Sequence, residues 1–243
     1  MKLEKKRAVI TGGTKGLGRA LVTRFLSEGA DIAICARNSK DLESAKKLAP
    51  AGRKIIALQC DISNSTSVNN FAESVLAEFG TVDILVNNAS KLGPRVPVAE
   101  YPIADWDEVV QTNINGTFFL TRLLIPSMMK RGTGCIINIS SSVGKAGRKN
   151  WGAYAVSKAG IEGMTQVLAD ELKSFNIRVN SVNPGPMATE MRRAAYPNED
   201  PSTLRTPDQL TDIFVYLASQ DGVGISGQSF DAATFISNPR IIS

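Results

Sequence analysis

Short apolar runs alternate along the chain with longer stretches in which apolar residues recur at helical spacing. The runs are rich in β-branched residues and end at glycine or polar residues, which is typical of buried strands. Because their central residues are nearly all apolar, we expect helices to cover both faces of the sheet. The predicted strands are Arg7–Thr11, Asp31–Ala36, Lys54–Cys60, Val82–Asn87, Gly134–Ser140, Ile177–Val182 and, with a fainter pattern, Gln228–Asp231.

The stretches between the strands predict helices, and glycines mark several of their ends. Gly29, Gly80 and Gly132 stand where left-handed C-terminal caps are expected. Strands that alternate with helices indicate βαβ units on a parallel sheet. The predicted fold class is α/β: one doubly wound domain over residues 1–243, a seven-stranded parallel sheet, and a short lid at about 186–206. The predicted helices are Leu17–Gly29, Ser39–Ala49, Ser65–Phe79, Asp105–Arg131, Trp151–Phe175 and Pro207–Ser219.

Composition narrows the chemistry that this fold can carry. With 243 residues and 43% hydrophobic content, the chain can bury a core without disulfides or structural metal. It contains no histidine, which excludes Ser-His-Asp and Cys-His nucleophile pairs and HExxH zinc helices. Cys35, Cys60 and Cys135 each lie in an apolar run, so we expect buried free thiols in a reducing compartment and no metal site.

The charge balance is basic but scattered. Lysine and arginine give a net charge of +5, and no basic face with interleaved aromatic residues is evident, so nucleic-acid binding is not favoured. The basic N-terminus leads into a short apolar run that Gly12 and Gly13 end before a signal-peptide core forms. No apolar stretch approaches the ~18 residues of a membrane span. We therefore expect a cytoplasmic protein that does not bind membranes.

A glycine-rich segment follows the first predicted strand and opens the first predicted helix. It reads Thr11-Gly12-Gly13-Thr14-Lys15-Gly16-Leu17-Gly18. Glycines let a pyrophosphate approach the backbone, and the helix N-terminus offers free N–H groups and partial positive charge to it. The alternative is an ordinary glycine-rich turn, but the strand before and the helix after favour a dinucleotide-binding Rossmann fold.

The end of the second strand indicates which dinucleotide is bound. An enzyme that binds NAD usually has a carboxylate there for the ribose 2′-hydroxyl, whereas NADP needs a cation for its 2′-phosphate. Here the expected acidic position is Ala36, the next residue is Arg37, and Lys15 supplies a second cation. The sequence therefore predicts NADP(H), the alternative being two solvated surface cations.

A tyrosine and a lysine four residues apart form the candidate catalytic pair. Tyr154 and Lys158 share one face of a predicted helix, and Ser141 ends the strand before it. A phenol acts as an acid or base near neutrality when its pKa falls from about 10, and a nearby ammonium favours the phenolate. Ser141 would hold the substrate oxygen near Tyr154. The alternative is a packing tyrosine and a surface lysine.

Taken together, these motifs resemble the short-chain dehydrogenase/reductase family over nearly the whole chain. The glycine spacing is similar to the family's TGxxxGxG loop, and Asn113 matches its helix asparagine, which holds a water linked to the lysine. The resemblance implies the catalytic residues Asn113, Ser141, Tyr154 and Lys158. It implies as cofactor-binding residues Gly12, Thr14, Lys15, Gly16, Leu17, Gly18, Arg37, Asp61, Ile62, Asn88, Ala89, Tyr154, Lys158, Pro184, Gly185 and Thr189.

The implied activity is that of an NADP(H)-dependent oxidoreductase. It would transfer hydride between the nicotinamide and a ketone or secondary alcohol, with Tyr154 as acid/base and a homodimer or homotetramer as the assembly. Alternatives are a 3-oxoacyl-carrier-protein reductase, which the short lid disfavours, and a non-catalytic NADP(H)-binding protein. Ser90 replaces the glycine of the family's NNAG turn. Ala232 and Ala233 replace two glycines near the C-terminus, which bears on the tetramer contact, and the C-terminal part resembles a short-lid bacterial subgroup.

Overall fold

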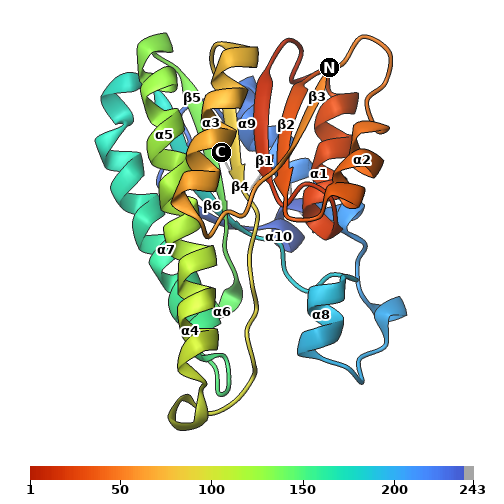
Figure 1. Cartoon of the computed structure of the whole chain (residues 1–243), viewed down its shortest axis with the longest axis vertical. Coiled ribbons are helices and arrows are strands. Elements are labelled where there is room, and N and C mark those ends of the chain that lie inside the picture. Colours follow the sequence, from red (N-terminus) through yellow and green to blue (C-terminus); the bar gives the residue numbers. More distant parts are fainter. Residues whose placement is uncertain (238–243) are drawn as a thin grey trace.

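The computed structural model of the chain describes residues 1–237 and has the predicted α/β architecture. One parallel sheet contains seven strands in the order β3-β2-β1-β4-β5-β6-β7, so the chain winds outward in both directions from β1 (Figure 1). The predicted fold class is confirmed, and the last six residues of the predicted 1–243 domain lie outside the described range. The strands are Arg7–Thr11 (β1), Asp31–Ala36 (β2), Ile55–Gln59 (β3), Ile84–Asn87 (β4), Gly134–Ile139 (β5), Ile177–Asn183 (β6) and Ser229–Asp231 (β7).

Alternating residues of each strand supply two hydrophobic cores, one on each face of the sheet. On one face, the strands pack against α1 (Gly16–Ser27), α2 (Ser39–Lys46), α9 (Asp212–Ala218) and α10 (Ala232–Ser237). On the other face, they pack against α3 (Ser65–Phe79), α5 (Gly116–Arg131) and α7 (Gly152–Glu171). Burial on both sides explains why the strands contain near-continuous apolar runs.

The helix predicted at Asp105–Arg131 begins earlier and changes its hydrogen bonding midway. It contains α4 (Ile103–Val110), a π-helical turn at Gln111–Asn115, and then α5. A π-turn is a single local widening, so the helical spacing of apolar residues on either side continues and does not reveal it. Asn113, a predicted catalytic residue, lies at the centre of this turn.

The predicted lid segment is partly helical. It contains α8 (Glu190–Ala195) and a 3-10 turn at Pro201–Thr203, and sequence periodicity does not reveal helices this short. Figure 1 places α8 below the sheet on one side, with α4 and α6 (Ser142–Lys145) on the other. These three helices lie beyond the carboxyl ends of the strands, which is where ligands bind in open parallel sheets.

A row of polar side chains crosses four strands, buried at Asn87, Asn138 and Ser181 and exposed at Ser229. Asn87, Asn138, Ser181 and Ser229 are direct neighbours in the register of β4, β5, β6 and β7. Asn87 Nδ2 donates to Asn138 Oδ1 at 2.8 Å, and Asn138 Nδ2 donates to Thr165 Oγ1 of α7 at 2.9 Å. The row therefore links the sheet to the helix that carries Tyr154 and Lys158.

Candidate active site

The glycine loop follows β1 and is shaped by close backbone contacts. Gly12 has φ +65°, a left-handed conformation that favours glycine. A Cβ at Gly18 would lie 2.2 Å from the Gly12 carbonyl oxygen and 2.6 Å from Asn88 Nδ2. Glycine at position 18 is therefore required for the first turn of α1 to pack on the loop.

The N-terminus of α1 has backbone N–H groups that no side chain caps and that can bind an anion. Lys15 is its N-cap and makes no side-chain cap hydrogen bond, and the first turn has no acidic residue. Thr14 and Leu17 are buried beneath this turn. The N–H groups of the turn and the helix dipole thus remain directed outward, as a bound phosphate requires.

Lys15 lies between the loop and two acidic side chains. Its Nζ is 3.4 Å from Asp41 Oδ2 of α2 and 3.9 Å from Glu190 Oε2 of α8. A Cβ at Gly16 would lie 3.3 Å from the Thr189 side chain. The structure therefore brings the start of the lid against the glycine loop.

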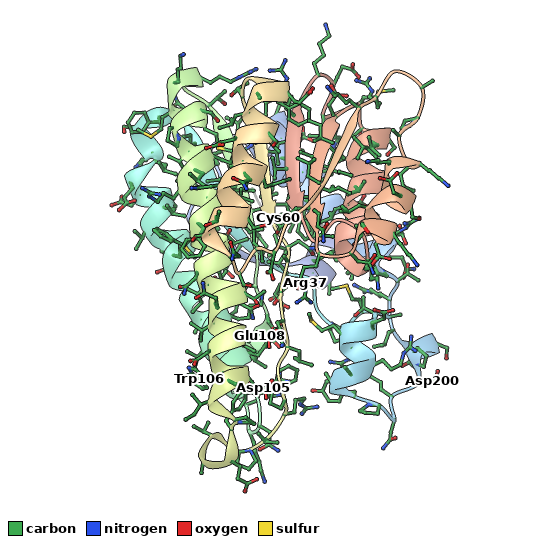
Figure 2. The ribbon with its side chains drawn as sticks, in the orientation of Figure 1. Arg37, Cys60, Asp105, Trp106, Glu108 and Asp200 are labelled. Carbon is green, nitrogen blue, oxygen red and sulfur yellow. The ribbon has the colours of Figure 1, made fainter. Side chains whose placement is uncertain are left out.

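The ends of β2 and β3 carry the residues predicted for the adenosine part of the cofactor. Arg37 is exposed, and Figure 2 draws it and Cys60 at the same edge of the sheet. Burial raises the pKa of Asp61, but hydrogen bonds from Ser63 and the nearby Arg37 outweigh burial, so the pKa lies below its usual value. Asp61 is therefore an anion that accepts hydrogen bonds beside a cation, and Ile62 is buried next to it.

Asn88 and Ala89, which are also predicted to bind the cofactor, form hydrogen bonds with Thr11. Their N–H groups both donate to Thr11 Oγ1 at 2.9 Å, and Asn88 Nδ2 donates to the Thr11 carbonyl at 2.8 Å. This cluster fixes the end of β4 to the glycine loop. Thr11 was missing from the predicted residues, although it opens the loop motif.

Tyr154, Lys158 and Ser141 come together at the carboxyl end of β5. Tyr154 is 9% exposed and Lys158 is 3% exposed, both on the buried face of α7. Lys158 Nζ lies 5.5 Å from the centroid of the Tyr154 ring and donates to the Ile139 carbonyl at 2.8 Å. The four-residue spacing therefore places Tyr154 and Lys158 next to each other on one face of α7, as the helical spacing predicts.

The predicted electrostatic effect on the tyrosine is wrong for the chain by itself. Burial raises the pKa of Tyr154 to about 12, and the hydrogen bond with Ser141 offsets this only in part. Burial likewise lowers the pKa of Lys158 to about 8, against the attraction of Glu162. Desolvation disfavours the charged form of both groups and outweighs the Ser141 hydrogen bond to Tyr154 and the attraction of Glu162 for Lys158. Tyr154 is consequently a protonated phenol at neutral pH, which is the form of a proton donor.

Glu162 is a neighbour of this pair that the sequence-based prediction missed. It lies one helical turn after Lys158 on α7 and accepts hydrogen bonds from three serine hydroxyls. Ser181 Oγ donates at 2.7 Å and Ser229 Oγ at 3.0 Å, and Ser140, which precedes Ser141, is the third donor. The carboxylate therefore joins α7 to the last three strands of the sheet.

Asn113 is buried, and both ends of its side chain are engaged. Its Oδ1 accepts from Lys91 N at 2.7 Å, and its Nδ2 donates to the Lys91 carbonyl and to Ser157 Oγ, each at 2.9 Å. Ser157 in turn donates to the Tyr154 carbonyl at 2.8 Å. Asn113 thus fixes the segment after β4 to the turn of α7 that holds Tyr154 and Lys158.

The segment after β6 leads from the sheet into the lid. Pro184 is buried, and Gly185 N–H donates to Asn183 Oδ1 at 3.1 Å. Thr189 is the N-cap of α8, where its Oγ1 accepts from Arg192 N at 3.2 Å. All three predicted residues of this segment therefore lie between the carboxyl end of β6 and the glycine loop.

The lid is joined to the site by a stack of aromatic and guanidinium groups. The Trp151 ring lies 5.7 Å from the Tyr154 ring and 6.1 Å from the Tyr196 ring, measured between centroids. Arg95 lies over both Trp151 and Tyr196, and Arg192 lies 3.9 Å from the Tyr196 centroid. The lid is thus packed against the site through Tyr196 and Arg192, both of which are half-buried.

Comparison with known proteins agrees with this geometry. The family model described as "short chain dehydrogenase" matches residues 6–200, most of the chain. The chain therefore belongs to the short chain dehydrogenase family.

Among individual relatives, the chain is 36% identical over 234 residues to the oxidoreductase YciK of Escherichia coli, covering 95% of this chain and 92% of that protein. It is 33% identical to the 3-oxoacyl-[acyl-carrier-protein] reductase FabG of Thermotoga maritima, covering 94% and 96% of the two chains. A crystal structure of a short chain dehydrogenase from Shigella flexneri complexed with NADP superposes with a TM-score of 0.91 at 35% identity, covering 96% and 99%.

Proposed function

We propose that the protein is an NADP(H)-dependent oxidoreductase that interconverts a ketone and a secondary alcohol, with Tyr154 as the acid/base. The observation that supports this most strongly is the meeting of Tyr154, Ser141 and Lys158 at the edge of the sheet where the glycine loop also ends. Membership of the short chain dehydrogenase family and relatives named as oxidoreductases support the same conclusion.

The residues present suit a dinucleotide with a 2′-phosphate. The loop has the space that only glycine leaves at position 18, and the uncapped N-terminus of α1 offers N–H groups for the pyrophosphate. Arg37 and Lys15 would hold the 2′-phosphate, and no acidic residue stands at position 36 to repel it. The similar Shigella flexneri structure is complexed with NADP. When bound, the cofactor supplies the hydride.

The chain's own groups would handle the proton and orient the substrate. Ser141 positions the carbonyl oxygen beside the Tyr154 hydroxyl, which gives its proton to the oxygen as negative charge develops there. Because an alkoxide is a stronger base than a phenolate, a phenol with a pKa of about 12 is still a competent donor. The ammonium of Lys158 then stabilises the phenolate that remains, and Asn113 holds the turn of α7 in place.

A 3-oxoacyl-carrier-protein reductase is the second candidate, because relatives with that name cover nearly the whole chain. A third, a non-catalytic NADP(H)-binding protein, would bind the cofactor without turnover.

For the assembly, we propose a homodimer or homotetramer. Large apolar side chains are exposed on α5 and α7, namely Phe118, Val156 and Val167, each with about half of its surface accessible. Burial of such side chains against a second copy is favourable. The three free thiols suit a reducing compartment, and we place the protein in the cytoplasm. In residues 1–237 no helix is both long and apolar enough to cross a membrane.

The decisive experiment is a panel of ketones and aldehydes with NADPH, followed by loss of nicotinamide absorbance. We expect at least one to be reduced, and NADPH to bind more tightly than NADH in a fluorescence titration. Tight NADPH binding with no turnover on any carbonyl would instead support the non-catalytic alternative. Activity confined to acyl-carrier-protein thioesters would support the second candidate.

A further inference from the structure

Arg95 occupies an unusual position in the loop after β4. It is half-buried, and its guanidinium carbon lies 4.7 Å from the Trp151 ring centroid and 4.5 Å from the Tyr196 ring centroid. One of its terminal N–H groups donates to the Ala195 carbonyl at the end of α8. The guanidinium thus lies between a residue that precedes α7 and the residue that follows α8.

Arg95 has no ion-pair partner in the part of the chain that the structure describes. Within residues 1–237, no carboxylate oxygen lies within 4.0 Å of its nitrogens. Its Nε is buried and has no hydrogen-bond acceptor in the same range. Aromatic faces attract a cation but accept none of its in-plane N–H groups, and a buried charged donor without a partner is unfavourable.

Arg192 provides an internal comparison, because it stacks on the same Tyr196 ring. Its Nε and one terminal nitrogen bind the Glu199 carboxylate, both at 2.6 Å. The two arginines therefore share an aromatic neighbour but differ in one respect: Arg192 has its own carboxylate and Arg95 does not. Among the described residues, a carboxylate therefore lies beside Arg192 but not beside Arg95.

Arg95 and Tyr154 share an aromatic neighbour. The Trp151 ring centroid lies 4.7 Å from the guanidinium carbon of Arg95 and 5.7 Å from the centroid of the Tyr154 ring. Trp151, Tyr154, Val143 and Ala195 form one apolar cluster around this point. We therefore expect a substrate whose carbonyl reaches Tyr154 to extend past Trp151 toward Arg95.

We propose that Arg95 determines substrate specificity by binding a carboxylate of the substrate, so that the preferred substrates are oxo acids or the matching hydroxy acids. This rests on the proposed function and adds the substrate class to it. A carboxylate fits better than a phosphate monoester, because one unbalanced cation meets one negative charge. The planar guanidinium also offers parallel N–H groups that suit a carboxylate.

The first test compares matched substrates on the holoenzyme. A 2-oxo, a 3-oxo and a 4-oxo acid are each supplied as the free carboxylate and as the methyl ester, and kcat/KM is measured with NADPH. We expect the wild type to prefer the carboxylate roughly 10- to 100-fold for at least one spacing, as for a hydrogen bond to a charged group. In Arg95→Gln this preference should vanish, so that the acid and its ester are reduced with similar kcat/KM.

The matched control is Arg192→Gln, which removes a guanidinium from the same stack but one that already has a carboxylate. It should keep the carboxylate preference even if the lid is loosened. Arg95→Lys keeps the positive charge and should retain part of the preference for the carboxylate. This variant covers the case in which Arg95→Gln folds poorly. Equal loss in the two glutamine variants, or no carboxylate preference in the wild type at any spacing, would overturn the proposal.

A binding measurement keeps this test separate from the test of the proposed function. In a Trp106→Phe background, Trp151 is the remaining tryptophan, and its fluorescence reports on its own stack with Arg95. The NADPH complex is titrated with the same acids and esters. If no carbonyl is reduced but the acids still bind more tightly than the esters through Arg95, the oxidoreductase proposal fails while the carboxylate site stands. If reduction occurs and the acids have no advantage, the reverse holds.

Discussion

The glycine loop and the start of α7 lie at the same edge of the sheet but are built from different materials. The loop is made of backbone: Gly12 turns it, and because Gly18 has no Cβ, the Gly12 carbonyl oxygen can lie 2.2 Å from where that Cβ would be. The α7 site is made of buried side chains, with Lys158 and Tyr154 held in an environment that disfavours their charged forms. A loop of backbone groups can bind an anion without titrating, whereas buried side chains can exchange protons.

This difference predicts that substitutions in the two regions affect separate quantities. Changes in the glycine loop should mainly weaken cofactor binding, and changes at the Tyr154 hydroxyl or the Lys158 amine of α7 should mainly reduce turnover. The following variants test that separation, from the largest expected effect to the smallest.

Tyr154→Phe should reduce kcat by roughly 10³-fold or more, because it removes the proton donor and little else. NADPH affinity, measured by nicotinamide fluorescence, should stay within about threefold of the wild type, since the ring and its packing against Trp151 remain. Turnover comparable to the wild type would remove Tyr154 as the acid.

Gly18→Ala should weaken NADPH binding by roughly 100-fold, because the new methyl group meets backbone that has to move for it. The control is Gly163→Ala in α7, where a Cβ meets no atom within 4 Å and alanine is the better helix former. The control should bind NADPH normally and gain slightly in melting temperature. Equal losses in both variants would show that helix glycines in general, rather than this contact, are responsible.

Lys158→Met should lower kcat roughly 100-fold and yet stabilise the fold at pH 7, by up to about 3 kcal/mol. The folded-state pKa of Lys158 is about 8 against 10.5 for a free lysine, so the unfolded chain binds the proton more readily. Wild-type stability should therefore rise with pH between about 8 and 10.5, closing the gap to the variant. Urea unfolding at pH 7 and pH 10 measures both. A variant that is less stable than the wild type at pH 7 contradicts the pKa shift.

Above about pH 8 the wild-type reduction rate should also fall as Lys158 loses its proton and no longer stabilises the phenolate. A kcat profile from pH 6 to pH 10 tests this. A rate that stays flat through pH 9 would show that Lys158 keeps its charge in the loaded enzyme.

Arg37→Gln should reduce the preference for NADPH over NADH by roughly 10- to 100-fold, as for loss of a charged hydrogen-bond partner, with NADH affinity nearly unchanged. Lys40→Gln, which removes another exposed cation of the same region, is the control and should keep the preference. If Lys40→Gln has the larger effect, the 2′-phosphate is held elsewhere than at the end of β2.

The features that local sequence determines were predicted well. The strand runs are apolar because both faces are covered, and the glycine spacing marks the loop because few other residues allow it. The pairing of Tyr154 and Lys158 follows from helical spacing alone. The roles assigned to these residues remain predictions until the variants above are measured.

The features that depend on distant contacts were not predicted. Arg95, Trp151 and Tyr196 come from three separate connections, and nothing local in any of them indicates the stack. The pKa of Tyr154 was predicted to fall and instead rises, because its sign depends on burial by the whole fold rather than on the nearby lysine. The hydrogen bonds of the Asn113 side chain with Lys91 and Ser157 likewise join separate segments and have no local signal.

The row of Asn87, Asn138, Ser181 and Ser229 has a consequence for how the second half of the sheet assembles. Aliphatic side chains can change neighbours at a small cost in free energy. In contrast, the amides of Asn87 and Asn138 each form one hydrogen bond to the adjoining strand and one to a helix. A slip by one position would bury unmatched amides and turn hydroxyls away from Glu162. These hydrogen bonds thereby favour the alignment of β4, β5 and β6 that delivers Ser141 to the tip of β5, facing α7.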